Sequence, residues 1–270
     1  GFFGTSLFYI VPFIVVLYYS VIDNIINKEF VFLDNYTLLF NNSAFTLAAE
    51  NTLLFSLIAV PLAVEMPLFL ALQLENVPGS SIFRTVLISP LMVPVASVVL
   101  IWEVLFHYNG AFNELLVQLG MIPVDWFKSE WSRIIIVVLY LWKNIGYNMI
   151  LFMSALGGIP HAVVESAQLD GASSFRIFWR VKFPFLYSSI FFVAILSLIN
   201  SFKVFREVYL LTGDYPYDSL YMLQHFMNNT FMSLDYQKLS AAAIIMCGVM
   251  IVIIGALFII DAKIGRDIEE

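Results

Sequence analysis

The sequence predicts an all-α membrane protein with six transmembrane helices. Of its 270 residues, 61% are apolar and 12% are charged, whereas an ordinary soluble domain carries about 25% charged residues. The mean hydropathy is +0.88. Apolar runs of about 20 residues, the length that a helix needs to cross the hydrocarbon core, recur six times along the chain. This composition excludes a disordered chain and argues against a soluble enzyme.

The spans follow from these runs, none of which alternates in the manner of a barrel strand. They are expected near residues 4–22, 52–74, 85–106, 134–156, 184–205 and 239–260. Prolines interrupt the first three spans at Pro12, Pro61, Pro67, Pro90 and Pro94. Neighbouring groups in a bundle can bind the carbonyls that proline frees, so kinked spans are expected. The whole chain, 1–270, is predicted to be a single transmembrane domain.

The Lys and Arg residues of the loops predict the orientation. Six lie in three short loops on one side, and five lie in three longer loops on the other. Because cytoplasmic loops are enriched in Lys and Arg, the first set is expected to be cytoplasmic, with both ends of the chain inside. The cytoplasmic loops are 75–84, 157–183 and 261–270, and the outer loops are 23–50, 106–133 and 206–238. Because the sequence starts at Gly1 rather than Met, residues before Gly1 are expected to be missing.

The cytoplasmic loop 157–183 is the least apolar part of the chain. Pro160 stands where a helix can begin, and residues 161–169 favour a short helix. Asp170-Gly171 is expected to end it, since glycine adopts a left-handed turn at little cost. A second amphipathic stretch starts at Ser173 or Ser174 and ends at Pro184. The loop is therefore predicted to form two short helices joined by a glycine turn.

The same loop resembles the EAA loop of ABC importer permeases. The resemblance is carried by Glu165-Ser166-Ala167, by Gly171 and by Val181-Lys182-Phe183-Pro184, and Ser166 stands where the motif usually has alanine. In that family the loop is a coupling helix that inserts into a cleft of an ATPase subunit. The resemblance implies that role for Glu165, Ser166, Ala167, Asp170 and Gly171.

Other segments resemble the first of the two permeases in carbohydrate importers of the maltose and glycerol-3-phosphate type. They are Leu33-Asp34-Asn35-Tyr36 with Asn51-Thr52, Phe83-Arg84 through Pro94, and Phe202 to Gly213. The chain departs from the family at Asp214-Tyr215, where a glycine pair is usual, and at Gln237-Lys238, where glycine and an aromatic residue are usual. Both departures lie in the predicted outer loop 206–238, on the face where the resemblance implies contact with the binding protein.

The resemblance also implies the assembly. It consists of this chain in the inner membrane, a second homologous permease, two ATPase subunits and an extracytoplasmic solute-binding protein, which together import a sugar or oligosaccharide. ATP and Mg²⁺ would bind to the ATPase subunits, and no cofactor is expected on this chain. Membrane lipid is an expected partner. Nucleic acid is not, because 20 acidic residues outnumber 13 basic ones.

A polar pathway near the membrane midplane is required for alternating access. Trp142, Gly146 and Met149 share one helical face by their spacing, and so do Asn200, Lys203, Val204 and Glu207, with Ser201 beside them. The resemblance places the sugar site on these faces. The candidates are Leu91, Val95, Trp142, Ile145, Gly146, Met149, Asn200, Ser201, Lys203 and Val204. Ordinary helix packing is the alternative for each of them.

Four charged side chains lie in or near apolar runs. Glu65 and Lys143 lie within such runs and need partners. Glu65 is expected either on a water-lined surface or near a basic group of the second permease. Lys203 with Glu207 can also be a simple i,i+4 ion pair.

Two other function classes fit the sequence less well. An ion-driven secondary transporter predicts inverted repeats and paired midplane carboxylates, and the sequence shows neither feature convincingly. A membrane enzyme lacks support because no HExxH, GxSxG or Cys/His cluster occurs, so neither a catalytic residue nor a metal site is expected. Without a GxxxxGK[ST] loop the chain is not expected to hydrolyse ATP itself. The acidic outer loops weakly disfavour polyanionic cargo, and the sequence does not name the sugar.

Overall fold

The computed structural model describes residues 2–75 and 77–269. Apart from an isolated bridge between Ile22 and Phe30, these residues form helices joined by turns. The all-α prediction is therefore confirmed. The chain divides into two compact units, of which unit 1 comprises Gly1–Leu53 with Thr212–Gly255 and unit 2 comprises Leu54–Leu211 with Ala256–Glu270.

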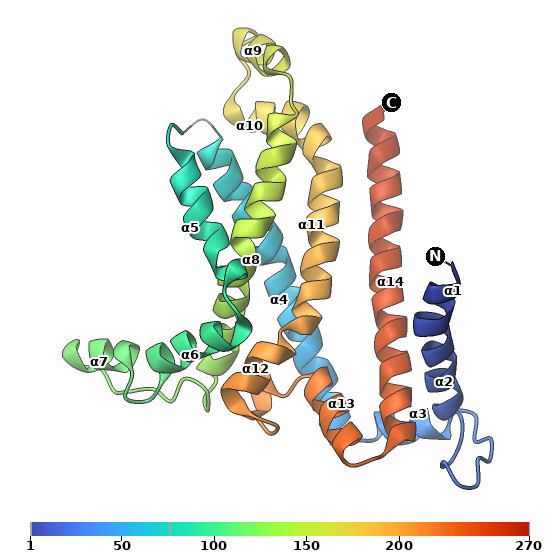
Figure 1. The fold of residues 1–270 in the computed structure, drawn as a ribbon. Coiled ribbons are helices and arrows are strands. Elements are labelled where there is room, and N and C mark those ends of the chain that lie inside the picture. Colours follow the sequence, from blue (N-terminus) through green and yellow to red (C-terminus); the bar gives the residue numbers. More distant parts are fainter. Residues whose placement is uncertain (1, 76, 270) are drawn as a thin grey trace. The chain divides into compact units, whose positions relative to one another are not determined.

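The helices follow one another as α1 (Phe2–Thr5), the π-helix η1 (Ser6–Ile10), α2 (Val11–Tyr19), α3 (Asp34–Phe40), α4 (Ser43–Leu74), α5 (Ser80–Met92), α6 (Val95–Phe106), α7 (Ala111–Gln118), α8 (Trp131–Gly157), α9 (His161–Leu169), α10 (Ser174–Ile177), the π-helix η2 (Phe178–Lys182), α11 (Phe183–Lys203), α12 (Phe205–Thr212), the 3₁₀ turn η3 (Asp218–Leu220), α13 (Leu223–Met232) and α14 (Tyr236–Glu269) (Figure 1).

Five stretches of the described chain are long and apolar enough to cross a membrane. They are Ser43–Leu74, Val95–Gln118, Trp131–Gly157, Ser174–Thr212 and Tyr236–Lys263. The predicted first span falls in Phe3–Tyr19, a shorter apolar helix. The count of six spans therefore stays a prediction.

The span predicted over 85–106 differs from the structure, which has two helices there, α5 and α6. Val93 is extended (ψ 133°) and Pro94 caps α6 (ψ 140°). A residue before proline is disfavoured in the helical region because the proline ring clashes with its backbone. The Pro94 carbonyl then accepts the first hydrogen bonds of α6, from the backbone N–H groups of Ser97 (2.9 Å) and Val98 (3.2 Å).

In unit 1, the start of α4 packs against α13 and α14. The rings of Phe45 and Phe226 meet edge to face, with 5.5 Å between their centroids. The Asn51 amide donates to the carbonyls of Asp218 (2.6 Å) and Tyr221 (3.0 Å), and the Thr52 hydroxyl accepts the backbone N–H of Leu223. These two polar residues therefore fasten the segment before α13 to α4.

In unit 2, α8 is the central helix and packs against both α5 and α11 (Figure 1). Buried polar side chains join the helices. Asn148 on α8 donates to the Ala63 carbonyl of α4 (2.7 Å) and to the Ser197 hydroxyl of α11 (3.0 Å), and the Tyr140 hydroxyl donates to the Ser197 carbonyl (2.6 Å). Such bonds stabilise helix packing where water is absent. They hold α4, α8 and α11 in a defined register.

Candidate functional site

The loop between α8 and α11 contains the two short helices that the sequence predicts, α9 and α10. Helix α9 begins directly after Pro160, whose extended backbone (ψ 123°) forms the N-terminal boundary. It ends in two bonds, from the Gly171 N–H to the Gln168 carbonyl and from the Ala172 N–H to the Ala167 carbonyl, both 3.0 Å. This pattern is a Schellman motif, which satisfies the last carbonyls of a helix.

Gly171 is the residue that makes this helix end. Its φ is +76°, in the left-handed region, and an added Cβ would meet nothing within 4 Å. The position thus requires glycine for its backbone conformation and not for space. Two residues later the Ser173 hydroxyl accepts the Arg176 N–H and caps α10.

The loop is packed firmly on the helices beneath it. Ile159 is buried, and Val164 and Phe178 pack with it against Leu156 of α8 and Leu186 of α11. The loop is therefore in direct contact with both α8 and α11.

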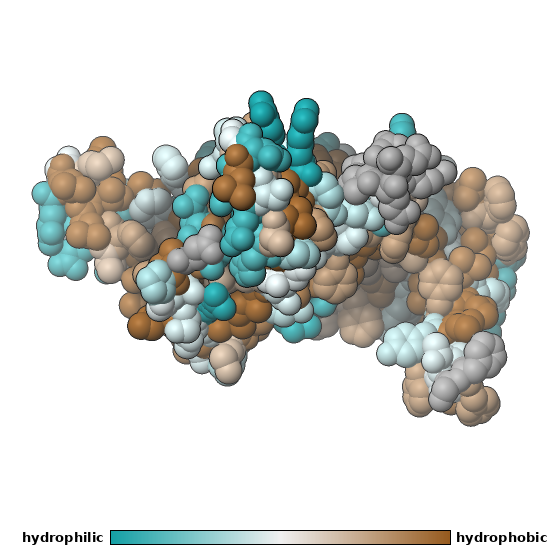
Figure 2. Space-filling view, turned by 90° about the horizontal axis from the view of Figure 1, so that it is seen from above, coloured by the Kyte–Doolittle hydropathy of each residue, from teal (hydrophilic) through white to brown (hydrophobic). Residues whose placement is uncertain are grey.

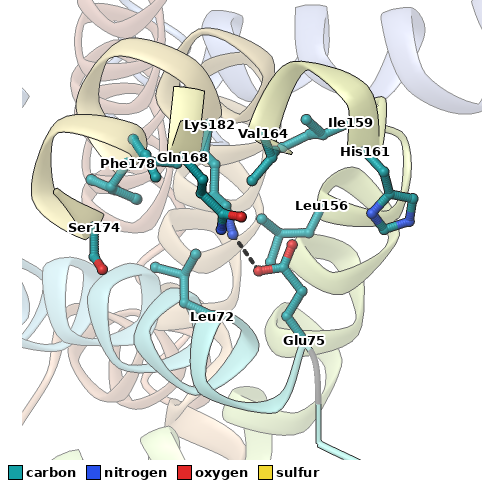
Figure 3. Close-up of a pocket in the computed structure, with 11 residues that line it drawn as sticks. Leu72, Glu75, Leu156, Ile159, His161, Val164, Gln168, Ser174, Phe178 and Lys182 are labelled. Carbon is teal, nitrogen blue, oxygen red and sulfur yellow. Dashed lines mark hydrogen bonds and ion pairs between the residues drawn. The ribbon is translucent and has the colours of Figure 1, made fainter. Parts of the chain in front are cut away.

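An ion pair ties the same loop to α4. Lys182 of η2 binds Glu75, which follows the last turn of α4, and Gln168 reaches toward the same point (Figure 3). The pair lies in a cavity of about 310 Å³ behind α9. No sequence signal joins these two charges, because 107 positions separate them.

The side of the loop that faces away from α8 and α11 is exposed. Glu165, Ser166, Asp170 and Gly171 are exposed, and Ala167 is half-buried. Leu169 beside them is 89% exposed. Figure 2 views the loop end-on and shows hydrophilic and hydrophobic side chains interspersed over it. The predicted coupling residues thus lie together at one end of unit 2, with an apolar side chain among them.

The second candidate region is a cavity of about 130 Å³ in unit 2, formed by α5, α6, α8, α11 and α12. Five predicted pathway residues line it, namely Leu91, Val95, Asn200, Lys203 and Val204. The other residues that line the cavity were not predicted as pathway residues; they are Leu139, Tyr140, Lys143, Asn144, Arg206 and Glu207. Within the cavity wall the Asn200 amide donates to the Asn144 side-chain oxygen (3.0 Å).

The other five predicted pathway residues lie outside this lining. The Trp142 ring lies 6.0 Å from that of Trp102, centroid to centroid, and Ile145 is half-buried on α8. Met149 is fully buried among core side chains. The Ser201 hydroxyl lies 2.9 Å from that of Ser56 on α4.

Gly146 lies at a helix contact. A Cβ added there would fall 2.0 Å from the Leu87 carbonyl oxygen. The backbone of α5 thus fills the space beside Gly146 on the face that was predicted to line the pathway. Glycine at this position allows the two backbones to approach closely.

Glu207 does not pair with Lys203 as the i,i+4 spacing suggested. It binds Lys143 of α8, and the side chains are 7% and 18% exposed, respectively. The sequence identified Lys143 as a charge in need of a partner but gave no indication of which one. Glu65 is exposed on α4 and forms no ion pair with the residues that the structure describes.

The chain matches the model of a known protein family. Residues 63–268 match the model of the binding-protein-dependent transport system inner membrane component. The sn-glycerol-3-phosphate transport system permease of Yersinia pseudotuberculosis is 30% identical over 93% of this chain and 87% of its own length. The trehalose/maltose transport system permease of Thermococcus litoralis is 30% identical over 88% and 81%, respectively.

A solved structure shares the fold. It is a chain of the bacterial alginate ABC transporter in complex with an alginate pentasaccharide-bound periplasmic protein. The TM-score is 0.85 at 22% identity, and the match covers 98% of this chain and 92% of that chain. The family model matches residues 63–268, which is most of the chain. The chain therefore belongs to the family of inner membrane components of binding-protein-dependent transport systems.

Proposed function

We propose that the chain is the transmembrane permease subunit of an ATP-driven ABC importer that moves a sugar or oligosaccharide into the cytoplasm. Relatives named for trehalose/maltose and for glycerol-3-phosphate transport support a carbohydrate or a related small polyol as cargo. A binding protein on the outer side delivers the cargo. A second homologous permease completes the pathway.

The loop from Pro160 to Lys182 carries this proposal. It combines an exposed surface, Glu165 to Gly171, with a buried side that packs on α8 and α11 and an ion pair to α4. A projecting loop of this kind transmits force between a partner bound to its exposed side and the helices packed on its buried side. Docked in an ATPase subunit, it converts closure of that subunit into movement of the spans.

The energy is supplied by the partners. ATP and Mg²⁺ bind to two ATPase subunits, and this chain acts as a transport subunit without its own ATPase site. The loop is cytoplasmic in this arrangement, in agreement with the basic residues Arg176, Arg180 and Lys182 that it carries. Both ends of the chain are then cytoplasmic.

The experiment is purification of the chain from its native membranes in mild detergent, with identification of the proteins that co-elute. We expect an ATPase subunit and a second permease. Leu169→Asp replaces the exposed apolar side chain of the loop with a carboxylate. It should reduce the amount of ATPase that co-elutes with the chain about tenfold, equivalent to about 1.4 kcal/mol of binding free energy.

The matched control is Leu119→Asp, which makes the same change at an exposed leucine (75%) outside the loop. It should leave the ATPase bound. Elution of the wild-type chain alone, or as a homo-oligomer without an ATPase, contradicts the proposal and favours a carrier driven by an ion gradient.

A further inference from the structure

The cavity of unit 2 has an excess of positive charge. Lys143, Lys203 and Arg206 line it together with a single carboxylate, Glu207. The ion pair between Lys143 and Glu207 neutralises both of these groups. Lys203 and Arg206 form no ion pair with any residue that the structure describes. Two positive charges in the cavity are therefore uncompensated within the described chain.

This excess of positive charge runs against the composition of the chain, which has a net charge of −7. Lys203 and Arg206 lie toward the end of the apolar stretch Ser174–Thr212, and both side chains are exposed. The cavity thus collects positive charge in an acidic protein, and its two unpaired cations are accessible to an anion from outside this chain.

The remaining lining suits a hydroxyl-rich molecule. Asn144 and Asn200 present side-chain amides, which are both donors and acceptors. The Asn200 amide uses one N–H in its bond to Asn144 and retains the acceptor capacity of its oxygen. Short amides of this kind bind sugar hydroxyls without adding charge.

We propose that this cavity binds the anionic group of an acidic carbohydrate, a carboxylate, phosphate or sulfonate, as the cargo passes. The inference rests on the proposed import function and names its substrate class. Arg206 supplies a planar guanidinium, which matches the geometry of oxyanions, and Lys203 supplies a compact point charge. The volume of about 130 Å³ is below the roughly 300 Å³ at which pockets enclose drug-sized ligands. The cavity therefore holds one group of the cargo and not the whole molecule.

The acidic outer loops disfavour polyanions, whereas the proposed cargo needs only one anionic group. Charges in solvent are screened beyond about 8 Å at physiological salt, so the loops oppose the approach of a single anionic group only weakly.

The test is equilibrium binding of radiolabelled monosaccharides to the detergent-purified assembly. The probes are D-glucuronate, D-glucose 6-phosphate, 6-deoxy-6-sulfo-D-glucose and neutral D-glucose, which differ only at C6. We expect at least one anionic probe to bind about tenfold more tightly than glucose, the equivalent of about 1.4 kcal/mol. The anion that binds best identifies the group.

Substitutions test whether Lys203 and Arg206 cause the preference for anionic probes. Lys203→Met and Arg206→Gln should each remove most of the anion preference, whereas Lys128→Met removes an exposed charge elsewhere in unit 2 and should leave the preference unchanged. Glucose binding as tight as anion binding, an anion preference that survives the double variant, or no binding of any probe would each overturn the inference. An assembly that still contains its ATPase but shows no anion preference overturns this inference alone, while absence of the ATPase overturns the proposed function.

Discussion

Gly171→Val is expected to lower ATP-driven uptake about tenfold or more while the chain still inserts and assembles. Valine disfavours the left-handed backbone (φ +76°) of this position by about 1–2 kcal/mol, roughly a tenfold effect on the population of the native turn. Relaxing φ breaks the bonds from Gly171 to Gln168 and from Ala172 to Ala167. Helix α9 then loses its fixed direction relative to α10. The measurement is uptake per ATP hydrolysed in reconstituted vesicles.

A matched control separates coupling from general strain. Gly79 precedes α5 with φ +78° and has open space around it, as Gly171 has. Gly79→Val therefore imposes the same backbone strain outside the loop and should leave uptake nearly normal. Gly171→Asn should retain most activity, because asparagine tolerates the left-handed region. Normal uptake by Gly171→Val would contradict the coupling role of the loop.

Gly146→Ala is expected to destabilise the protein strongly. The added Cβ would lie 2.0 Å from the Leu87 oxygen and 2.6 Å from the Ile88 nitrogen, which are backbone atoms that cannot rotate away. Helix α5 must therefore move off α8. Overpacking of this kind costs about 1–3 kcal/mol. The measurement is the temperature at which the detergent-solubilised protein loses its monodisperse peak in size-exclusion chromatography.

The control for this prediction lies on the same helix. Gly157 is the last residue of α8, and a Cβ there meets nothing within 4 Å. Gly157→Ala should leave the melting temperature unchanged or raise it slightly, since alanine favours the helix. If both substitutions lowered stability equally, the close contact between α5 and α8 would be wrong.

Features that are local in sequence were predicted well. The helix 161–169, its end at Asp170-Gly171 and the second short helix all appear in the structure, because proline, glycine and serine act on the backbone within a few residues of themselves. The break at Val93-Pro94 has the same local cause. A proline within an apolar run predicts a kinked span, because nothing local distinguishes a kink from a full interruption.

Features that depend on a neighbouring helix were predicted less well. Helical spacing places Trp142, Gly146 and Met149 on one face, but it does not say that the α5 backbone fills the space above Gly146. The spacing of Lys203 and Glu207 allowed an ion pair, yet Lys143 on another helix is the partner of Glu207. The contacts of Ser201 with Ser56 and of Lys182 with Glu75 likewise join distant positions. Such pairings are set by tertiary packing.

Uptake into vesicles distinguishes an ATP-driven importer from a carrier driven by an ion gradient. The purified assembly is reconstituted, the binding protein with its radiolabelled cargo is added outside, and ATP with Mg²⁺ is enclosed inside. We expect accumulation that requires enclosed ATP and persists when ionophores collapse all ion gradients. Accumulation that needs an ion gradient and proceeds without ATP would contradict this expectation, and would identify the chain as a gradient-driven carrier.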